Sequence, residues 1–483
     1  MLFNSLGFLA FLGIAFFLYW FLFSKNKITQ NTFLAIASFV FYSFWDWRFS
    51  ILLAVSVAIN FYGGILIEKA DNHVTKYRRL LLIVFVNIGI LFYFKYFNFF
   101  ISSFNDFLIL FGYKGDVRLL SIILPIGISF YTFHGLSYVL DLYYSRIRTT
   151  KSILDYTVFV AYFPLLVAGP IERATHLLPQ LKEKRKFNYQ QGVQGLELIL
   201  WGFFKKLVIA DSLAPFVSNF FNHPAEYNSV TLILGVVAFA FQVYGDFSGY
   251  TDIARGISKL FGIELLLNFN YPYFSKSIPE FWSRWHISLS SWLNDYVFMP
   301  IALQLRNLGK HGIFIAVFLT FIISGFWHGA SWHYVAWGAF HGLLYIPFVY
   351  KGKGLRSIFG AKHKKFEIKD VPFIIFTFSL VLVGYVLFRA DTLSAAIDYY
   401  NGIFSKSILQ MPEFQGKTRF FITLILVFFM FILEITAFHQ TNPLSVVSKL
   451  KHRLIRWFFY ALILFLIGMY MNSEVSSFIY FQF

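Results

Sequence analysis

The stretch HGIFIAVFLTFIISGFWHGA, residues 311–330, indicates what kind of protein this chain is. It contains no Asp, Glu, Lys or Arg, and a helix of about 20 apolar residues crosses the hydrocarbon core of a bilayer. Comparable apolar runs recur along the 483 residues, and we predict that each is a membrane-spanning helix. They lie at residues 5–23, 31–46, 49–67, 79–98, 119–141, 192–209, 229–245, 311–330, 332–350, 371–389, 418–438 and 455–472.

The composition excludes an ordinary soluble protein. Hydrophobic residues make up 58% of the chain and charged residues 13%, whereas roughly 25% of residues are charged in soluble proteins. Mean hydropathy is +0.63. We therefore expect an all-α fold, a polytopic transmembrane helical bundle, with residues 1–483 forming a single domain because no Ser/Gly-rich linker divides them. The chain has no cysteine, which excludes disulfides, thiolate metal sites and a cysteine nucleophile.

The formal net charge of +17 has a topological explanation. Lys and Arg accumulate in the cytoplasmic loops of membrane proteins, so the charge requires no nucleic-acid partner. The first apolar run is followed by Lys25 and Lys27 rather than preceded by positive charge, so we predict a retained helix with its N-terminus outside, not a signal peptide. We place the basic connections Lys69–Arg79, Arg146–Lys151, Arg173–Lys186, Lys351–Lys369 and Lys449–Arg456 on the cytoplasmic side.

Two stretches do not have the pattern of simple spans. Val158–Pro170 is apolar but short, and prolines and a glycine interrupt it. It predicts a re-entrant segment, which membranes tolerate only where protein encloses the backbone. Asp252–Met299 mixes apolar residues with many polar ones, including His286, Asn294 and Asp295. So much polar material between spans predicts a cavity in this part of the bundle.

The densest group of polar residues within apolar sequence contains four histidines: His286, His328, His333 and His341. His328 ends a long apolar run among small residues, which permit close helix contacts or leave room for a ligand. A neutral imidazole there has the chemistry to take a proton from a hydroxyl group. For His333 and His341 we expect packing roles, and for His134 a hydrogen bond between helices.

The same residues argue against other sites. His328 and His333 are five positions apart, so a helix does not place them on one face, and the HExxH zinc pattern is missing. We therefore predict no metal site. No Gly-rich phosphate loop is found, and Gly245-Asp246-Phe247-Ser248-Gly249 is not the G-x-S-x-G elbow of a serine hydrolase.

Two motifs carry a resemblance to a known family. FWSRWHISLSSWLNDYVFMP (Phe281–Pro300) contains His286, and 42 positions later His328 lies in SGFWHGASWHYVAWGAFHG. Together they resemble the membrane-bound O-acyltransferase (MBOAT) family, and within it most closely the membrane subunits of bacterial alginate O-acetylation. A more distant resemblance is to the proteins of D-alanine transfer to teichoic acid. Further matching segments are Leu124–Tyr144, Phe163–Arg173, Tyr244–Ile278, Val386–Tyr400 and Phe478–Phe483.

The resemblance implies a helical bundle with re-entrant and in-plane helices around a central tunnel. The family's catalytic histidine falls on His328, and its second polar position, Asn or His elsewhere in the family, falls on His286. Trp285 and Trp327 are candidates for lining the tunnel as substrate-binding residues, with plain packing as the alternative. Asp295 is a candidate for fixing a neighbouring Arg or His, or for capping a helix.

The implied reaction is transfer of an acetyl or other acyl group to hydroxyls of an extracytoplasmic polysaccharide. The expected donor is acetyl-CoA or an acyl-carrier thioester on the cytoplasmic side, with no bound cofactor. A periplasmic or surface acetyltransferase is the expected partner, and a bacterial cytoplasmic (inner) membrane the expected location, in contact with membrane lipid. After Pro300 the chain reads IALQLRNLGKHG instead of the Gly-Gly-Asn-Arg turn of alginate-type members, which puts the polymer in doubt.

Three alternatives remain at this point. In the first, the acceptor is a different one: teichoic acid that receives D-alanine, a lipid or a protein. In the second, the chain is a transporter, which predicts inverted repeats that the sequence does not show. In the third, the chain is an inactive scaffold, and the retention of both His286 and His328 argues against this.

Overall fold

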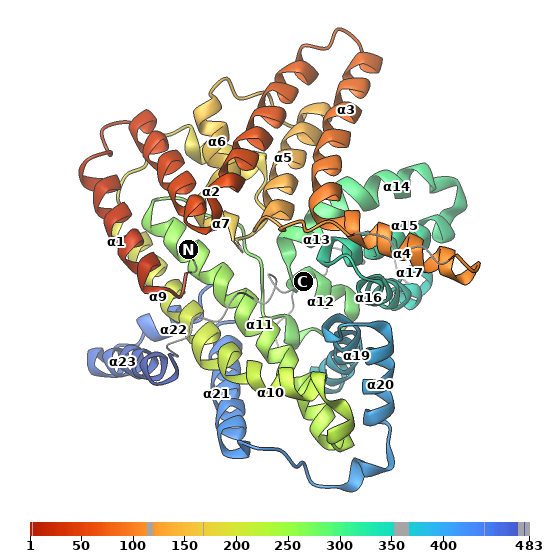
Figure 1. Cartoon of the computed structure of the whole chain (residues 1–483). Coiled ribbons are helices and arrows are strands. Elements are labelled where there is room, and N and C mark those ends of the chain that lie inside the picture. Colours follow the sequence, from red (N-terminus) through yellow and green to blue (C-terminus); the bar gives the residue numbers. More distant parts are fainter. Residues whose placement is uncertain are drawn as a thin grey trace. The chain divides into compact units, whose positions relative to one another are not determined.

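The computed structural model describes residues 1, 3–113, 119–167, 169–351, 367–438, 440–471 and 478. Most of the predicted connection Lys351–Lys369 and of the terminal motif Phe478–Phe483 lies outside these residues. The described part of the chain contains helices and no strand, which confirms the all-α class (Figure 1).

Seven helical segments of the described chain are long and apolar enough to cross a membrane. The chain is therefore a multi-pass membrane protein. Leu6–Phe21 is a further apolar helix but is shorter. The seven segments are Lys27–Glu68, His73–Leu110, Ser229–Leu260, Arg306–His328, Ile368–Arg389, Lys417–Thr436 and Arg453–Tyr470.

The chain forms two compact units, of which unit 1 comprises Met1–Tyr189 and Ser258–Leu265. At its centre α2 packs against α3, α5 and α6. The backbone of α2 leaves the helical conformation at Asp46 (φ −159°, ψ 112°), where the sequence separates two predicted spans. Its helices are α1 (Leu6–Phe21), α2 (Lys27–Glu68), α3 (His73–Leu91), the π-helix η1 (Phe92–Tyr96), α4 (Phe97–Leu110), α5 (Ile128–Tyr143), α6 (Ile153–Ala161), α7 (Phe163–Leu166) and α8 (Ala174–Leu181).

Two features of unit 1 depend on turn residues. The predicted span 119–141 is wrong at its start, because α5 begins only at Ile128. Gly127 takes a left-handed conformation (φ 73°), and a Cβ there would lie 2.0 Å from the backbone oxygen of Leu166. The stretch Val158–Pro170 breaks into α6 and α7, with Pro164 in the first turn of α7, and protein buries both short helices.

Unit 2 comprises Gln190–Ile257 and Leu266–Phe483. The predicted span 332–350 is wrong, because α16 ends after 12 residues and α17, with Pro347 in its first turn, starts a new helix. The main helices are α9 (Tyr189–Phe203), the π-helix η2 (Phe204–Ala210), α10 (Asp211–Asn222), α11 (Ser229–Leu260), α12 (Ile278–Arg284), α13 (Ile287–Leu293), the π-helix η5 (Asn294–Phe298), α14 (Met299–Gln304), α15 (Gly309–His328), α16 (Trp332–Leu343), α17 (Ile346–Lys351), α19 (Val371–Arg389), α20 (Leu393–Ile403), α21 (Lys417–Thr436), α22 (Ser445–Ser448) and α23 (Arg453–Tyr470). Short 3-10 turns connect them at η3 (Pro224–Glu226), η4 (Pro272–Phe274), η6 (Arg306–Leu308), η7 (Ile368–Asp370) and η8 (Lys406–Leu409).

The tightest helix pair of unit 2 is α15 against α16. Glycines on both helices permit this approach: a Cβ on Gly325 would lie 2.2 Å from the backbone oxygen of Tyr334, and one on Gly338 would lie 2.3 Å from that of Phe321. Small residues at such contacts are how membrane helices pack closely. The pair matters for the site because α15 ends at His328.

We predict that Gly338→Ala lowers the stability of the folded protein. The added methyl group meets backbone that cannot turn aside, and overpacking of this kind costs about 1–3 kcal/mol. Thermal unfolding of the purified protein in detergent measures the loss. Gly89→Ala is the control, since a Cβ at Gly89 has no atom within 4 Å. An equal effect of the two substitutions would show that the contact at Gly338 is not tight.

Candidate active site

The backbone holds His286 in an uncommon conformation between α12 and α13. Its φ of 44° and ψ of 52° lie in the left-handed region, where a residue other than glycine costs of order 1–3 kcal/mol and needs support from its surroundings. Hydrogen bonds on both sides give that support. The N–H of Ile287 donates to the carbonyl of Asn268 over 2.9 Å, and the N–H of Asn270 donates to the carbonyl of Arg284 over 2.9 Å.

The side chain of Asn268 fixes the tautomer of His286. Asn268 Oδ1 accepts hydrogen bonds from the backbone N–H of Ser288 at 3.3 Å and from its hydroxyl at 2.8 Å. Because a backbone N–H only donates, the amide oxygen must face it. His286 Nδ1 lies 3.0 Å from the same oxygen and therefore carries the proton.

The other ring nitrogen of His286, Nε2, then has a free lone pair. It is buried and has no hydrogen-bond partner. In the sequence, His286 lies between α11 and α15, and it belongs to none of the seven apolar segments. Burial lowers its pKa to about 3, so the ring is neutral near pH 7. A buried, neutral acceptor of this kind suits a hydroxyl group of a substrate.

His328 is the last residue of α15 and is buried. Its ring packs at near right angles against Trp337 and Phe388, with centroids 5.0 and 5.1 Å away. The ring of Trp327 lies 5.0 Å from that of His328 and 5.7 Å from that of His286. The sum of these two distances places the imidazole centres at most 10.7 Å apart. The structure thus brings together both predicted histidines and Trp327.

The other predicted substrate-binding residues lie differently. Trp285 stacks on Phe281 and meets Phe269 edge-on, with centroids 5.6 and 5.0 Å away, as a packing aromatic does. Asp295 is half-buried in the first turn of η5 and accepts a hydrogen bond from Asn294 Nδ2 over 3.0 Å.

The remaining histidines make contacts of a packing kind. His333 Nδ1 donates to the carbonyl of Leu387 over 3.0 Å. His341 is buried between the rings of Trp282 and Trp337, 5.1 and 5.0 Å away. In unit 1, His134 Nε2 accepts from the backbone N–H of Glu172 over 3.0 Å. Within the described chain no three His, Asp or Glu side chains converge in a way that would hold a metal ion.

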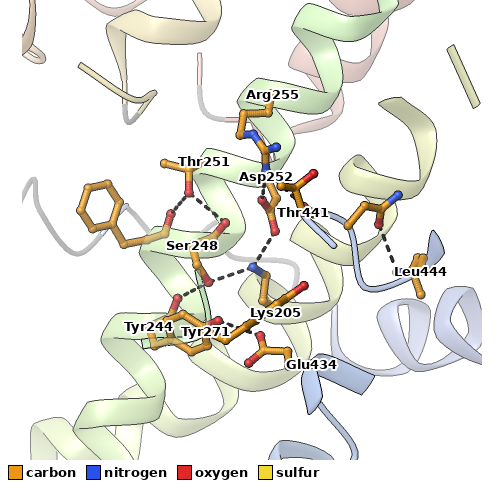
Figure 2. Close-up of polar contacts among 12 residues, drawn as sticks. Lys205, Tyr244, Ser248, Thr251, Asp252, Arg255, Tyr271, Glu434, Thr441 and Leu444 are labelled. Atoms are coloured by element: carbon orange, nitrogen blue, oxygen red, sulfur yellow. Dashed lines mark hydrogen bonds and ion pairs between the residues drawn. The ribbon is translucent and has the colours of Figure 1, made fainter. Parts of the chain in front are cut away.

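A charged network on α11 was missed by the sequence analysis (Figure 2). Lys205 Nζ lies 2.7 Å from Asp252 Oδ2 and 2.9 Å from Ser248 Oγ. Asp252 also pairs with Arg255 at 3.2 Å. Lys205 belongs to the π-helix η2, a conformation that is frequent near functional sites. Two lysines inside the predicted span 192–209 were the signal, because ionisable residues in apolar runs need a partner.

This network connects to the site through α11. In Figure 2 Tyr244 lies beside Lys205 and Glu434, and its hydroxyl donates to Glu434 Oε1 over 2.7 Å. Phe247 on the same helix meets the ring of His286 edge-on at 4.7 Å. The ion pairs of Asp252 therefore fix α11, and Phe247 of the same helix packs against His286.

Comparison with known proteins adds the following. The sequence profile described as "MBOAT, membrane-bound O-acyltransferase family" matches residues 39–380. "Probable alginate O-acetylase AlgI" of Pseudomonas aeruginosa is 38% identical over 80% of this chain and 71% of its own length. "Peptidoglycan O-acetyltransferase" of Helicobacter pylori is 33% identical over 83% of this chain and 80% of its own. "Teichoic acid D-alanyltransferase" of Streptococcus thermophilus is 29% identical over 54% of this chain and 68% of its own.

We predict that Lys205→Met destabilises the fold more than an exposed ion pair would. Breaking a buried pair by removing one partner costs about 3–5 kcal/mol, since it leaves a buried charge. The measurement is unfolding in detergent with Lys369→Met as control, because the Lys369–Glu367 pair is exposed and worth about 0–1 kcal/mol. An equal loss of stability in Lys205→Met and Lys369→Met would argue against a buried ion pair at Lys205.

The low pKa of His286 predicts a stability that falls in acid. Between about pH 3 and 6.5 the unfolded chain binds a proton at this residue and the folded protein does not. The contribution of neutral His286 to the free energy of unfolding is therefore complete above about pH 6.5. It falls as the pH drops toward 3, by up to about 1.4 kcal/mol per pH unit. His286→Asn should reduce the slope of unfolding free energy between pH 6 and pH 5. An unchanged slope in His286→Asn would mean that the buried ring is protonated.

Proposed function

Because this chain belongs to the membrane-bound O-acyltransferase family, and is thus an acyltransferase, we propose that it transfers acetyl groups to a polysaccharide. The acetyl group comes from a cytoplasmic thioester and reaches hydroxyls outside the cytoplasmic membrane. The relatives named for alginate and peptidoglycan O-acetylation support both the group and the class of acceptor. The observation that carries the proposal is the contact of Trp327 with both imidazoles.

We assign His328 the role of general base. It takes the proton of the acceptor hydroxyl while the oxygen attacks the thioester carbonyl and forms the new ester C–O bond. The C–S bond then breaks, and the leaving thiolate receives that proton from the imidazolium. A positioned base contributes typically 10²–10⁴-fold to the rate, and holding donor and acceptor together contributes further.

His286 has a different role in this proposal. As a neutral ring with its proton on Nδ1, it cannot donate a hydrogen bond from Nε2 to a developing oxyanion. It accepts one from a neighbouring hydroxyl of the acceptor sugar, so it orients the sugar while the reacting hydroxyl gives its single proton to His328. Trp327, in contact with both rings, forms the wall against which the reacting groups lie. Trp285 supports the aromatic cluster with Phe281 and Phe269, and Asp295 supports η5.

The donor side and the location follow from the topology expected of the chain, and the partner follows from the resemblance to the family. Acetyl-CoA or an acylated carrier protein supplies the thioester from the cytoplasm, and the basic connections attract its negative charge. No bound cofactor takes part. Residues 1–483 act as one membrane domain with a tunnel between the two sides of a bacterial inner membrane. A periplasmic or surface acetyltransferase completes the transfer where the polymer does not enter the tunnel.

A second candidate is D-alanyl transfer to teichoic acid. The relative named as a teichoic acid D-alanyltransferase supports it, although it matches only 54% of this chain. The two candidates share the chemistry of the site and differ in the acyl group and in the acceptor.

We predict that His328→Ala removes O-acetyl ester from the exopolysaccharide of cells that depend on this protein. The general base is lost, so the transfer rate should fall about 10²–10⁴-fold. His286→Asn, which keeps a hydrogen-bonding group, should retain part of the activity. The measurement is ester content per polymer at matched membrane abundance of each variant.

The control is His223→Gln, since His223 is exposed and distant in sequence from both motifs. Normal acetylation in His328→Ala cells would contradict the assignment of the base. Loss of D-alanyl ester instead of acetyl ester would favour the second candidate.

A further inference from the structure

A hollow of about 460 Å³ lies in unit 1, between the end of α1 and the segment after α8. Aromatic rings of Phe16, Trp20 and Phe187 form part of its wall, and Trp20 meets Phe187 edge-on at 5.5 Å. Three consecutive cationic residues, Lys184–Lys186, form another part. None of the residues assigned to the reaction, His286, Trp327 and His328, lines this hollow.

The central cation of the three is buried among neutral groups. Arg185 is 6% exposed, and its guanidinium donates from Nε to the hydroxyl of Tyr19 over 2.8 Å and from Nη2 to Asn31 Oδ1 over 2.6 Å. Its third nitrogen, Nη1, is buried and has no hydrogen-bond partner. A buried charge is costly unless an opposite charge offsets it.

The carboxylates nearby do not offset this charge. Asp155 is linked to Arg185 through Asn31, whose Nδ2 donates to Asp155 over 2.7 Å. The ammonium group of Lys27 lies 3.9 Å from the carboxylate of Asp155. Glu183 is exposed on the same segment. Across the described residues, no ion pair includes Lys184, Arg185 or Lys186. The hollow therefore has an excess of positive charge that an anion would balance.

The surroundings of the hollow are those of a lipid rather than of a soluble anion. At the C-terminal end of α1, the side chains of Phe17, Phe21 and the following Leu22 are 56%, 69% and 58% exposed. Trp20 donates from Nε1 to the carbonyl of Leu260 over 2.9 Å, which holds its ring against the hollow. Aromatic rings with basic residues at the end of an apolar helix are typical of the level of lipid headgroups.

We infer that the hollow between α1 and Lys184–Lys186 binds the phosphate of an anionic glycerophospholipid. The phosphodiester accepts hydrogen bonds from Lys184 and Lys186 and balances the buried guanidinium of Arg185. The acyl chains lie along the exposed apolar face of α1. The bound lipid thereby joins α1 to the segment that follows α8.

Native mass spectrometry of the full chain in detergent, with equal amounts of phosphatidylglycerol and phosphatidylcholine, tests this inference. The wild-type protein should retain phosphatidylglycerol preferentially, and Lys184→Gln/Lys186→Gln should reduce that preference at least tenfold. Lys69→Gln/Lys151→Gln removes the same charge from two exposed lysines of unit 1 and should leave it unchanged. Thermal unfolding confirms that both double variants are folded.

Two results would overturn the inference. One is an equal preference for phosphatidylglycerol in the wild-type protein and in Lys184→Gln/Lys186→Gln. The other is displacement of the lipid by micromolar acetyl-CoA or by inorganic phosphate, which would assign the hollow to a soluble phosphate instead of a lipid.

Discussion

Burying a polar group away from water is the physical constraint on which this structure depends. In a bundle of mostly apolar residues, each buried donor, acceptor or charge must find its partner within the protein. Lys205 finds Asp252 and Ser248, and His286 Nδ1 finds Asn268. These bonds fix α11 and the turn before α13, the two elements that meet at His286. The position of His286 is therefore a consequence of satisfying the buried polar groups around it.

The buried polar atoms that have no partner are informative for the same reason. His286 Nε2 is a neutral acceptor beside Trp327, which is in contact with a second imidazole. Arg185 Nη1 belongs to a permanent cation beside a hollow with two further cations. The first arrangement suits a neutral hydroxyl group that donates a hydrogen bond, and the second suits an anion. The chemistry of these two atoms thus indicates what kind of group each would bind.

Much of the fold could be predicted from the sequence because a bilayer demands long apolar helices. The prediction failed where turn chemistry overrides hydropathy, at Gly127 before α5 and at Pro347 in the first turn of α17. His286 and His328 were predicted from motifs that resemble the family, and the structure places both imidazoles against the ring of Trp327. The pairing of Lys205 with Asp252 was missed because the partners are 47 positions apart and meet only when α11 packs on η2.

The backbone at position 286 also restricts which residues this turn accepts. A left-handed conformation is several-fold more accessible to Asn, Asp and His than to most other residues. The side chain must in addition bond to Asn268 Oδ1, which requires a donor, and this excludes an ionised Asp. Asn and His meet both conditions. In this chain the imidazole also carries a second nitrogen past the bond to Asn268, so the same turn that restricts the residue delivers a buried acceptor to the ring of Trp327.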